Sequence, residues 1–423
     1  MNTNTLTFVA PHLACGGARG RRISEGSVTS EPRSRRPKEP ARVAQVVCSR
    51  RLSVLIVPDK FKGTLSAGRA AEAIARGWRK ARPEDCLVLL PMSDGGDGFG
   101  EVISGLLNAR LQTISAIDAA HRPCAAHWWW QPETRTAIVE SAKIIGLAML
   151  PPKQFHPYAL DTAGLGAIFP ALAAAGAKRC LAGIGGSATN DGGFGLARAL
   201  GWEFLDRRGR PLEQWTALDK LARLRAPRRR RWFKELRVAV DVQNRLLGPR
   251  GATRVYGPQK GLQPEDFDRA EHCLGCLARV VRRQFGHDFA REPGAGAAGG
   301  LGFGLLAFLG AGLEPGFELF ARQAGLERHL RRADVVITGE GSIDPSTLMG
   351  KGVGQIARRC RKLNLPCIGL AGVVHDRASA VAPRAFTQMR ALTELTSLEK
   401  ARAQPVRWLE RLAQRVAGEI RPS

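Results

Sequence analysis

The feature that most constrains the fold of this chain is a repeated unit, in which an apolar strand runs into a glycine-rich loop that carries an acidic residue. Residues 53–59 read Ser-Val-Leu-Ile-Val-Pro-Asp, and residues 87–91 lead into the loop Asp94-Gly-Gly-Asp-Gly98. The same pattern, an apolar strand followed by a glycine-rich acidic loop, recurs at residues 179–193 and 333–344. Strands that alternate with helices are typical of α/β architecture, in which ligands bind at the carboxyl ends of parallel strands. We therefore predict that these acidic loops lie at ligand-binding sheet edges.

The middle of the chain has a different pattern. Residues 111–118, 125–130 and 134–141 read as adjacent strands that pair as a meander, and the polar, Arg-rich residues 206–235 read as an exposed connector. A length of 423 residues exceeds what one hydrophobic core usually serves. We predict a two-domain α/β protein with three parts: a disordered basic extension (1–51), a discontinuous Rossmann-like domain with a parallel sheet (52–98 with 298–423), and an inserted α/β domain with a mixed sheet (99–297).

The net charge of +26 raises the alternative of a basic nucleic-acid-binding protein. Much of the excess charge lies in residues 19–51 and in the run Arg228 to Arg231, and no recognition helix, zinc finger or aromatic-interleaved strip accompanies it. We therefore expect no specific nucleic-acid partner. No apolar run reaches the roughly 18–20 residues of a membrane-spanning helix, so we expect no membrane partner.

The cysteines and the first fifty residues bear on location. The nine cysteines are odd in number and scattered through apolar segments, which is typical of a reducing compartment, and we expect a cytoplasmic protein. The N-terminal segment lacks the apolar core of a secretory signal, and its acidic residues argue against a transit peptide. A targeting leader is the alternative to a disordered extension.

The residue types in the glycine loops favour phosphate chemistry. Glycines allow backbone N–H groups to wrap an anion, and carboxylates can hold Mg²⁺ or accept a hydroxyl proton. Lys60, Lys62, Lys260 and Lys351 lie in or beside these loops, where they can contact phosphate oxygens. The chain contains no G-x-x-x-x-G-K-[ST] loop and no protein-kinase motif set. A G-x-G-x-x-G match at residues 294–299 follows a polar segment instead of a strand, which argues against a dehydrogenase.

Six motifs in order resemble the bacterial type 1 glycerate kinases. They are Pro58-Asp-Lys-Phe-Lys-Gly-Thr-Leu-Ser-Ala67, Pro91-Met-Ser-Asp-Gly-Gly-Asp-Gly98, Gly183-Ile-Gly-Gly-Ser-Ala-Thr-Asn-Asp-Gly-Gly193, Gly257-Pro-Gln-Lys-Gly261, residues 293–300, and Val336-Ile-Thr-Gly-Glu-Gly341. The resemblance implies phosphorylation of D-glycerate by ATP with Mg²⁺ at a cleft between two domains. It favours 2-phosphoglycerate over 3-phosphoglycerate as the product, and it leaves a homodimer open. Ser342 and Ser346 depart from the family pattern, so a kinase of another small hydroxy acid is the main alternative.

The resemblance, together with the loop chemistry, implies roles for particular residues. We predict that Asp191 is the base for the acceptor hydroxyl, and that Asp59 and Lys62 share the catalytic work. Lys62 and Lys260 offset negative charge on the phosphates or on the glycerate carboxylate. Asp94, Glu340 and Asp344 are the predicted metal ligands. The predicted substrate and ATP contacts are Lys60, Gly95, Gly96, Gly185, Gly186, Ser187, Thr189, Asn190, Lys260, Gly296, Gly299 and Lys351.

Overall fold

The computed structural model of the chain describes residues 51–344, 347, 352–375 and 386–420. The predicted extension therefore lies almost wholly outside the described residues, as do Ser346 and Lys351. Two main β-sheets organise the described part, one with five strands and one with six, and a two-stranded hairpin accompanies them. Among the helices described, none has both the length and the apolar character required to cross a bilayer.

The first sheet is entirely parallel. Its strands follow the order β13-β12-β11-β1-β2, with bounds β13 (Gln388–Ala391), β12 (Cys367–Val374), β11 (Val335–Ile343), β1 (Ser53–Pro58) and β2 (Cys86–Leu89). The apolar run of β1 is buried on both faces, as expected for a parallel strand between two helical layers. Val54 and Ile56 pack in one core, and Leu55 and Val57 pack in another.

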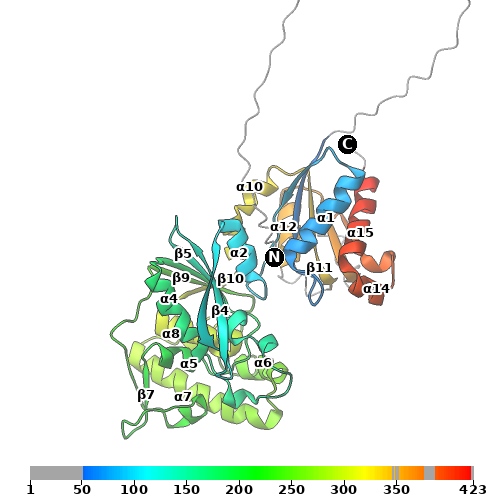
Figure 1. Cartoon of the computed structure of the whole chain (residues 1–423). Coiled ribbons are helices and arrows are strands. Elements are labelled where there is room, and N and C mark those ends of the chain that lie inside the picture. Colours follow the sequence, from blue (N-terminus) through cyan, green and yellow to red (C-terminus); the bar gives the residue numbers. More distant parts are fainter. Residues whose placement is uncertain (1–50, 345–346, 348–351, 376–385, 421–423) are drawn as a thin grey trace, which may run out of the picture. The chain divides into compact units, whose positions relative to one another are not determined.

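Helices cover both faces of this sheet. On one face α1 (Ala67–Ala81) and α15 (Pro405–Glu419) lie side by side (Figure 1), with Ile74 and Trp78 packed in the same core as Leu409 and Leu412. Ser66 caps α1 by accepting a hydrogen bond from the backbone N–H of Arg69. The other face is covered by α9 (Gly316–Ala324), α10 (Leu326–Leu330) and α12 (Gly352–Lys362).

The second sheet is mixed. Its order is β10-β9-β6-β5-β4-β3, with bounds β10 (Gly312–Pro315), β9 (Glu235–Val240), β6 (Arg179–Gly183), β5 (Thr136–Glu140), β4 (Pro123–Gln131) and β3 (Arg110–Ile117). Strands β3, β4 and β5 pair antiparallel, which confirms the predicted meander, and the remaining neighbours pair parallel. The predicted fold class, a parallel sheet and a mixed sheet with α/β connections, is therefore confirmed.

The helices around the second sheet include those that follow the glycine-rich loops of the sequence motifs. They are α2 (Phe99–Leu107), α3 (Ala142–Ile145), α4 (Ile168–Ala174), α5 (Phe194–Ala199), α6 (Ala252–Lys260), α7 (Phe267–Phe285) and α8 (Ala297–Leu309). The small hairpin consists of β7 (Glu203–Leu205) and β8 (Arg223–Arg225).

Two details differ from the sequence predictions or refine them. Residues 206–235 are not simply an exposed connector, because Trp215, Leu218 and Leu224 are buried in the core of the second sheet. Burial of the apolar side chains in this stretch is possible beside many arginines because the arginine guanidinium groups stay near solvent.

The domain boundaries stay a prediction. The pairing of β10 with β9 favours a boundary after Pro315 instead of before Ala298.

Candidate active site

A cavity of about 1320 Å³ lies at the carboxyl ends of strands from both sheets. It is lined by the loops that follow β1, β2, β6 and β9, and by the ends of β11 and β12. The charged and hydroxyl residues of its wall include Asp59, Lys60, Lys62, Asp94, Asp97, Ser187, Asp241, Lys260, Glu340 and Asp344. The loops that the sequence predicted to converge therefore do share one cavity.

One end of the cavity, here called the acidic end, contains Asp59, Asp94 and Glu340. It lies at the topological switch point of the first sheet, where the strand order reverses. From β1 the chain builds β2 on one side, and it later returns to build β11, β12 and β13 on the other. The backbone N–H of Asp59 donates to the carbonyl oxygen of Gly339 at 2.8 Å, so Asp59, directly after β1, lies beside Glu340 within β11. Ligands of open parallel sheets bind at such a point, because the loops diverge there and leave a crevice.

Asp59 is the most electrostatically perturbed carboxylate of the wall. Only 8% of its surface is exposed, and burial raises its pKa to about 7; the neighbouring Asp94 and Glu340 carboxylates also raise it. Lys60 partly offsets this effect through its charge and its backbone N–H, which lies 2.7 Å from Asp59 Oδ1. Strongly perturbed carboxylates in a cavity are frequent at functional sites.

The loop between β2 and α2 is fixed by contacts with the second sheet. The backbone N–H of Gly185 donates to the Gly95 carbonyl at 3.3 Å, and a Cβ on Gly185 would lie 2.7 Å from the Cα of Gly96. Lys60 Nζ donates to the carbonyl oxygen of Asp97 at 3.0 Å. Only glycines allow the two loops to approach this closely, so the glycine-rich motifs are needed for loop-to-loop packing as well as for ligand access.

Glu140, at the end of β5, holds the same loop from the other side. Its two carboxylate oxygens accept the backbone N–H groups of Gly98 (3.0 Å) and Gly100 (2.9 Å) at the start of α2. The side chain is 1% exposed, and burial raises its pKa while these two hydrogen bonds lower it. A carboxylate at a helix N-terminus satisfies backbone donors that have no partner within the helix.

Lys260 defines the opposite, basic end of the cavity. It is the last residue of α6, where Gly261 takes a left-handed conformation (φ 107°) that ends the helix. Its Nζ donates to the hydroxyl of Ser187 at 3.0 Å and to the carbonyl of Thr189 at 2.6 Å. Burial lowers the pKa of Lys260 to about 7, against the opposing effect of the Asp191 carboxylate. A buried cation with few partners beside a cavity is suited to an anionic ligand.

The family model described as "Glycerate kinase family" matches residues 54–421. The chain belongs to the glycerate kinase family. "Glycerate kinase" of Bacillus subtilis (strain 168) is 36% identical over 375 residues, which cover 88% of this chain and 98% of that protein. "Glycerate 2-kinase" of Escherichia coli (strain K12) is 33% identical and covers 83% of this chain and 93% of that protein.

A solved structure agrees with these sequence comparisons. The crystal structure of a putative glycerate kinase 2 from Salmonella typhimurium LT2 is similar to this chain with a TM-score of 0.75 and 33% identity, covering 87% of this chain and 98% of that one. The resemblance seen in the sequence motifs is therefore confirmed, and the chain is a phosphotransferase of the glycerate kinase family.

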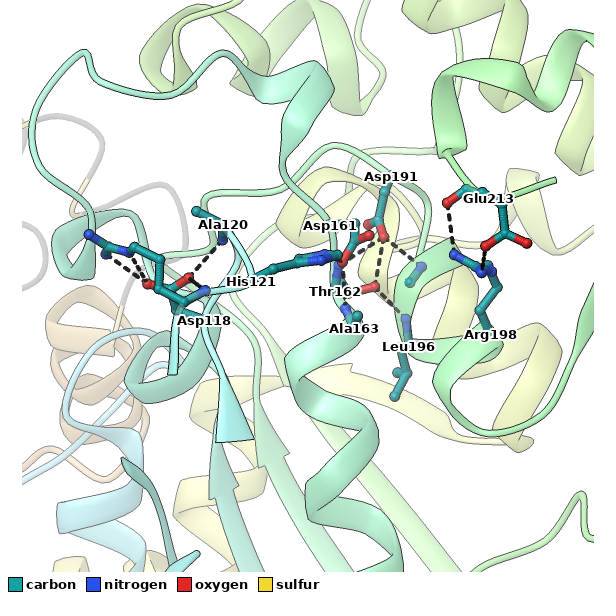
Figure 2. A network of polar contacts seen from close by, with 12 residues as sticks. Asp118, Ala120, His121, Asp161, Thr162, Ala163, Asp191, Leu196, Arg198 and Glu213 are labelled. Carbon is teal, nitrogen blue, oxygen red and sulfur yellow. Dashed lines mark hydrogen bonds and ion pairs between the residues drawn. The ribbon is translucent and has the colours of Figure 1, made fainter. Parts of the chain in front are cut away.

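Within this glycerate kinase family member, the position of Asp191 does not fit the predicted role of base. Its side chain is 0% exposed and is absent from the cavity wall. Oδ2 accepts hydrogen bonds from Thr162 N (3.0 Å), Thr162 Oγ1 (2.7 Å) and Gly195 N (2.9 Å), and Oδ1 accepts one from Gly193 N (3.1 Å), as Figure 2 shows in part. These donors occupy the carboxylate, which anchors the start of α5. Burial, reinforced by the charge of Asp161, raises its pKa to about 6.

The predicted substrate contacts divide into two groups. Lys60, Lys62, Gly96, Gly185, Gly186, Ser187 and Lys260 line the cavity, whereas Gly95, Thr189, Asn190, Gly296 and Gly299 do not. Gly299 packs so closely that a Cβ there would lie 1.9 Å from the Thr189 carbonyl oxygen, and at Gly296 it would lie 2.2 Å from the Arg245 carbonyl oxygen. Gly299 therefore fits as a packing position beneath the loop 185–191 and Gly296 as one beneath the segment after β9, and neither fits as an ATP contact.

The predicted metal ligands Asp94, Glu340 and Asp344 all line the cavity. Across the residues that the structure describes, no three His, Cys, Asp or Glu side chains are arranged to hold a metal ion by themselves. Glu340 Oε1 accepts a hydrogen bond from Thr347 Oγ1 at 2.8 Å, and Asp344 Oδ1 accepts one from Thr347 N at 3.2 Å. Such a wall still fits Mg²⁺, which commonly uses one or two carboxylates and completes its shell with water and substrate phosphates.

Sequence reasoning missed Glu140 as a residue of this site, and the resemblance to the family includes Asp241 among its retained acidic residues without giving it a role. Glu140 and Asp241 both line the cavity, and burial raises the pKa of each carboxyl, with Asp94 contributing to the shift at Asp241. Each stands at the end of a strand of the second sheet, or directly after it. The rule that located Asp59 and Asp94, an acidic residue after an apolar strand, would also have selected these two.

Proposed function

We propose that this protein transfers the γ-phosphoryl group of ATP to a hydroxyl of D-glycerate, yielding 2-phosphoglycerate and ADP, in the cavity described above. The observation that carries the proposal is that one cavity is lined both by the carboxylates of Asp59, Asp94 and Glu340 and by the buried Lys260. Phosphoryl transfer requires a place for the charged phosphates beside a group that binds and orients the acceptor. The names of the relatives support glycerate as the acceptor, and the E. coli name supports the 2-phosphate product.

In this proposal the acceptor lies at the basic end. The Lys260 ammonium and the Ser187 hydroxyl bind the glycerate carboxylate, because both line the cavity and a buried cation favours an anion. The backbone of Gly185 and Gly186 leaves room for the small acid beside them. Binding the carboxylate there fixes which hydroxyl faces the phosphate, and orientation of this kind supplies much of the rate acceleration in phosphoryl transfer.

Asp59 takes the proton from the acceptor hydroxyl. Its pKa of about 7 lies near neutral pH, where a general base is most effective. The hydroxyl oxygen forms a bond to the γ-phosphorus while the bond from that phosphorus to the β–γ bridging oxygen breaks, and ADP carries away the bond pair. Lys60 and Lys62 offset charge on the phosphate oxygens. Asp94 and Glu340 would hold Mg²⁺, which neutralises phosphate charge when bound.

An assay with purified full-length protein tests the proposal. ADP release would be followed with D-glycerate, L-glycerate and a panel of other small hydroxy acids, with the Asp59→Asn variant as the control for contaminating kinases. Product formation would be followed with enolase alone, which accepts 2-phosphoglycerate directly. We expect ATP- and Mg²⁺-dependent turnover that is highest with D-glycerate and an immediate enolase signal. Higher turnover with another hydroxy acid, or an enolase signal that needs added mutase, would contradict the acceptor or the product proposed here.

A further inference from the structure

The segments that line the cavity can be followed from neighbour to neighbour, and the cavity continues beyond Asp59, Asp94 and Glu340. On the first sheet Ser342 of β11 pairs with Val373 of β12, so the cavity extends from Glu340 across β11 to β12. A Cβ on Gly341 would lie 3.2 Å from the backbone nitrogen of Lys62, which places the loop after β1 directly beside β11. The cavity therefore runs from β12, past β11 and β1, to the loops of the second sheet that hold Lys260.

The same neighbour relations continue to the basic end. A Cβ on Gly96 would lie 3.1 Å from Lys60 Nζ, and Gly96 itself packs against Gly185. Ser187 follows two residues later and accepts the hydrogen bond from Lys260. Along this series of neighbouring segments, Lys260 lies at one end and the end of β12 at the other. The carboxylates of Asp59 and Glu340 and the ammonium of Lys60 lie between them.

The β12 end of the cavity is largely apolar and has no part in the mechanism above. Behind it lie η8 (Leu392–Glu394) and α14 (Leu398–Ala403). Leu392 (2% exposed) and Ala401 (3% exposed) form the buried part of this wall, and Leu398 is 40% exposed. The residues of this end that line the cavity are Gly372, Val373, His375, Leu392, Leu398, Ala401, Arg402 and Pro405.

Leu398 is one of a small group of exposed large apolar side chains in the described part of the chain. The others are Leu111, Leu147, Val255 and Leu363, and within this group only Leu398 and Leu147 line the cavity. Leu147 belongs to the basic end, because its backbone N–H donates to the Gly186 carbonyl at 2.9 Å. An exposed leucine inside a large cavity indicates a ligand with an apolar surface at that point.

We propose that the β12 end is the subsite for the nucleotide base, with the purine ring of ATP against Leu398 and Val373 and beside the Arg402 guanidinium. The assignment rests on the proposed function. A purine has flat apolar faces that pack on aliphatic side chains and on a guanidinium plane. With the base here, the triphosphate reaches past Gly341 toward Lys62 and Asp59, and the γ-phosphate faces the acceptor at Lys260. The reverse orientation would place an uncharged base against the buried Lys260 ammonium.

The test uses Leu398→Ala and Leu398→Glu in the full-length protein. We expect the KM for ATP to rise roughly three- to tenfold for the alanine variant, because apolar contact with the base is lost, and further for the glutamate variant. The kcat and the KM for glycerate should stay within about twofold of wild type. The inhibition constant of inorganic tripolyphosphate, which has no base, should not change. Leu363→Ala is the matched control, since Leu363 is 36% exposed and lies outside the cavity wall.

Two results would overturn the subsite. One is an unchanged KM for ATP in both variants; the other is a parallel weakening of tripolyphosphate, which would show that Leu398 acts on the phosphate region. Binding of a ribose-labelled fluorescent ATP analogue, measured without acceptor, separates this proposal from the proposed function. If the wild-type protein fails to phosphorylate glycerate while the Leu398 variants still lose affinity for the analogue, the function is wrong and the subsite stands.

Discussion

The Nζ of Lys260 lies 3.0 Å from the hydroxyl oxygen of Ser187, in a position that leaves the lysine only 6% exposed. Two segments more than seventy residues apart are joined by this contact, the end of α6 and the glycine loop after β6. Its hydrogen bonds and the Asp191 charge offset the burial penalty of the ammonium only in part, and an anionic ligand would relieve more of it.

Lys260→Met should change how stability depends on pH. The pKa of Lys260 is about 7 in the folded protein, against 10.5 ordinarily, so between these values the unfolded chain binds more protons and the free energy of unfolding rises with pH. Methionine removes this contribution. We expect the variant to gain roughly 1–3 kcal/mol relative to wild type at pH 7, and less at pH 9.5, in urea denaturation. Lys178→Met, at an exposed lysine, is the control; an equal difference at both pH values for Lys260→Met would refute the burial effect.

Asp59→Asn should separate activity from stability. The pKa of Asp59 is about 7 in the folded state and 3.8 ordinarily, so between pH 3.8 and 7 the folded state binds more protons and its stability falls as pH rises. Asparagine has no charge to bury. We expect the variant to be roughly 1–3 kcal/mol more stable than wild type at pH 8 and close to it at pH 4, while turnover falls more than about a hundredfold. Destabilisation at pH 8 would contradict this account of the site.

Asp191→Asn should act on the fold. An amide cannot accept all four hydrogen bonds that reach this carboxylate, because its NH₂ group would face the Gly193 donor in one orientation and the Thr162 and Gly195 donors in the other. We expect a loss of roughly 2–4 kcal/mol in the free energy of unfolding, with turnover per folded molecule reduced less than about tenfold. Urea denaturation measures the free energy of unfolding, and activity assays with active-site titration measure turnover per folded molecule. An unchanged unfolding midpoint with a hundredfold loss of turnover would restore Asp191 as a chemical group.

Glu140→Gln should loosen the loop that carries Asp94. Glutamine offers one acceptor oxygen where two backbone N–H groups, of Gly98 and Gly100, need partners. We expect turnover to fall about tenfold and the Mg²⁺ concentration needed for half-maximal activity to rise, with a loss of roughly 1–3 kcal/mol in stability. Glu101→Gln, at an exposed residue of α2, the helix whose start Glu140 contacts, is the control and should retain wild-type behaviour. A stability loss without any change in the Mg²⁺ dependence would limit Glu140 to a structural role.

Much of the architecture was predictable because it depends on local patterns. The apolar run before Asp59 and the strand-ending acid at Asp94 are visible in the sequence, and a parallel sheet brings the carboxyl ends of its strands to one edge whatever the connecting helices contain. The ends of strands from both sheets meet at the cavity, and Asp59, Asp94, Lys260 and Glu340 could be selected from the sequence alone.

The direction of each side chain was decided only by tertiary structure. Asp191 and Asp94 both stand in glycine loops after a strand, yet one is enclosed by Thr162 and the start of α5 and the other lines the cavity. Glu140 follows the same local rule of an acidic residue at a strand end, but its contacts with Gly98 and Gly100, about forty residues away in the chain, appear only in the tertiary structure. Sequence determined which segments end in carboxylates and glycines, through local strand and turn preferences. Whether a carboxylate faces a ligand or a backbone donor depends on contacts between distant segments, and no local pattern encodes those.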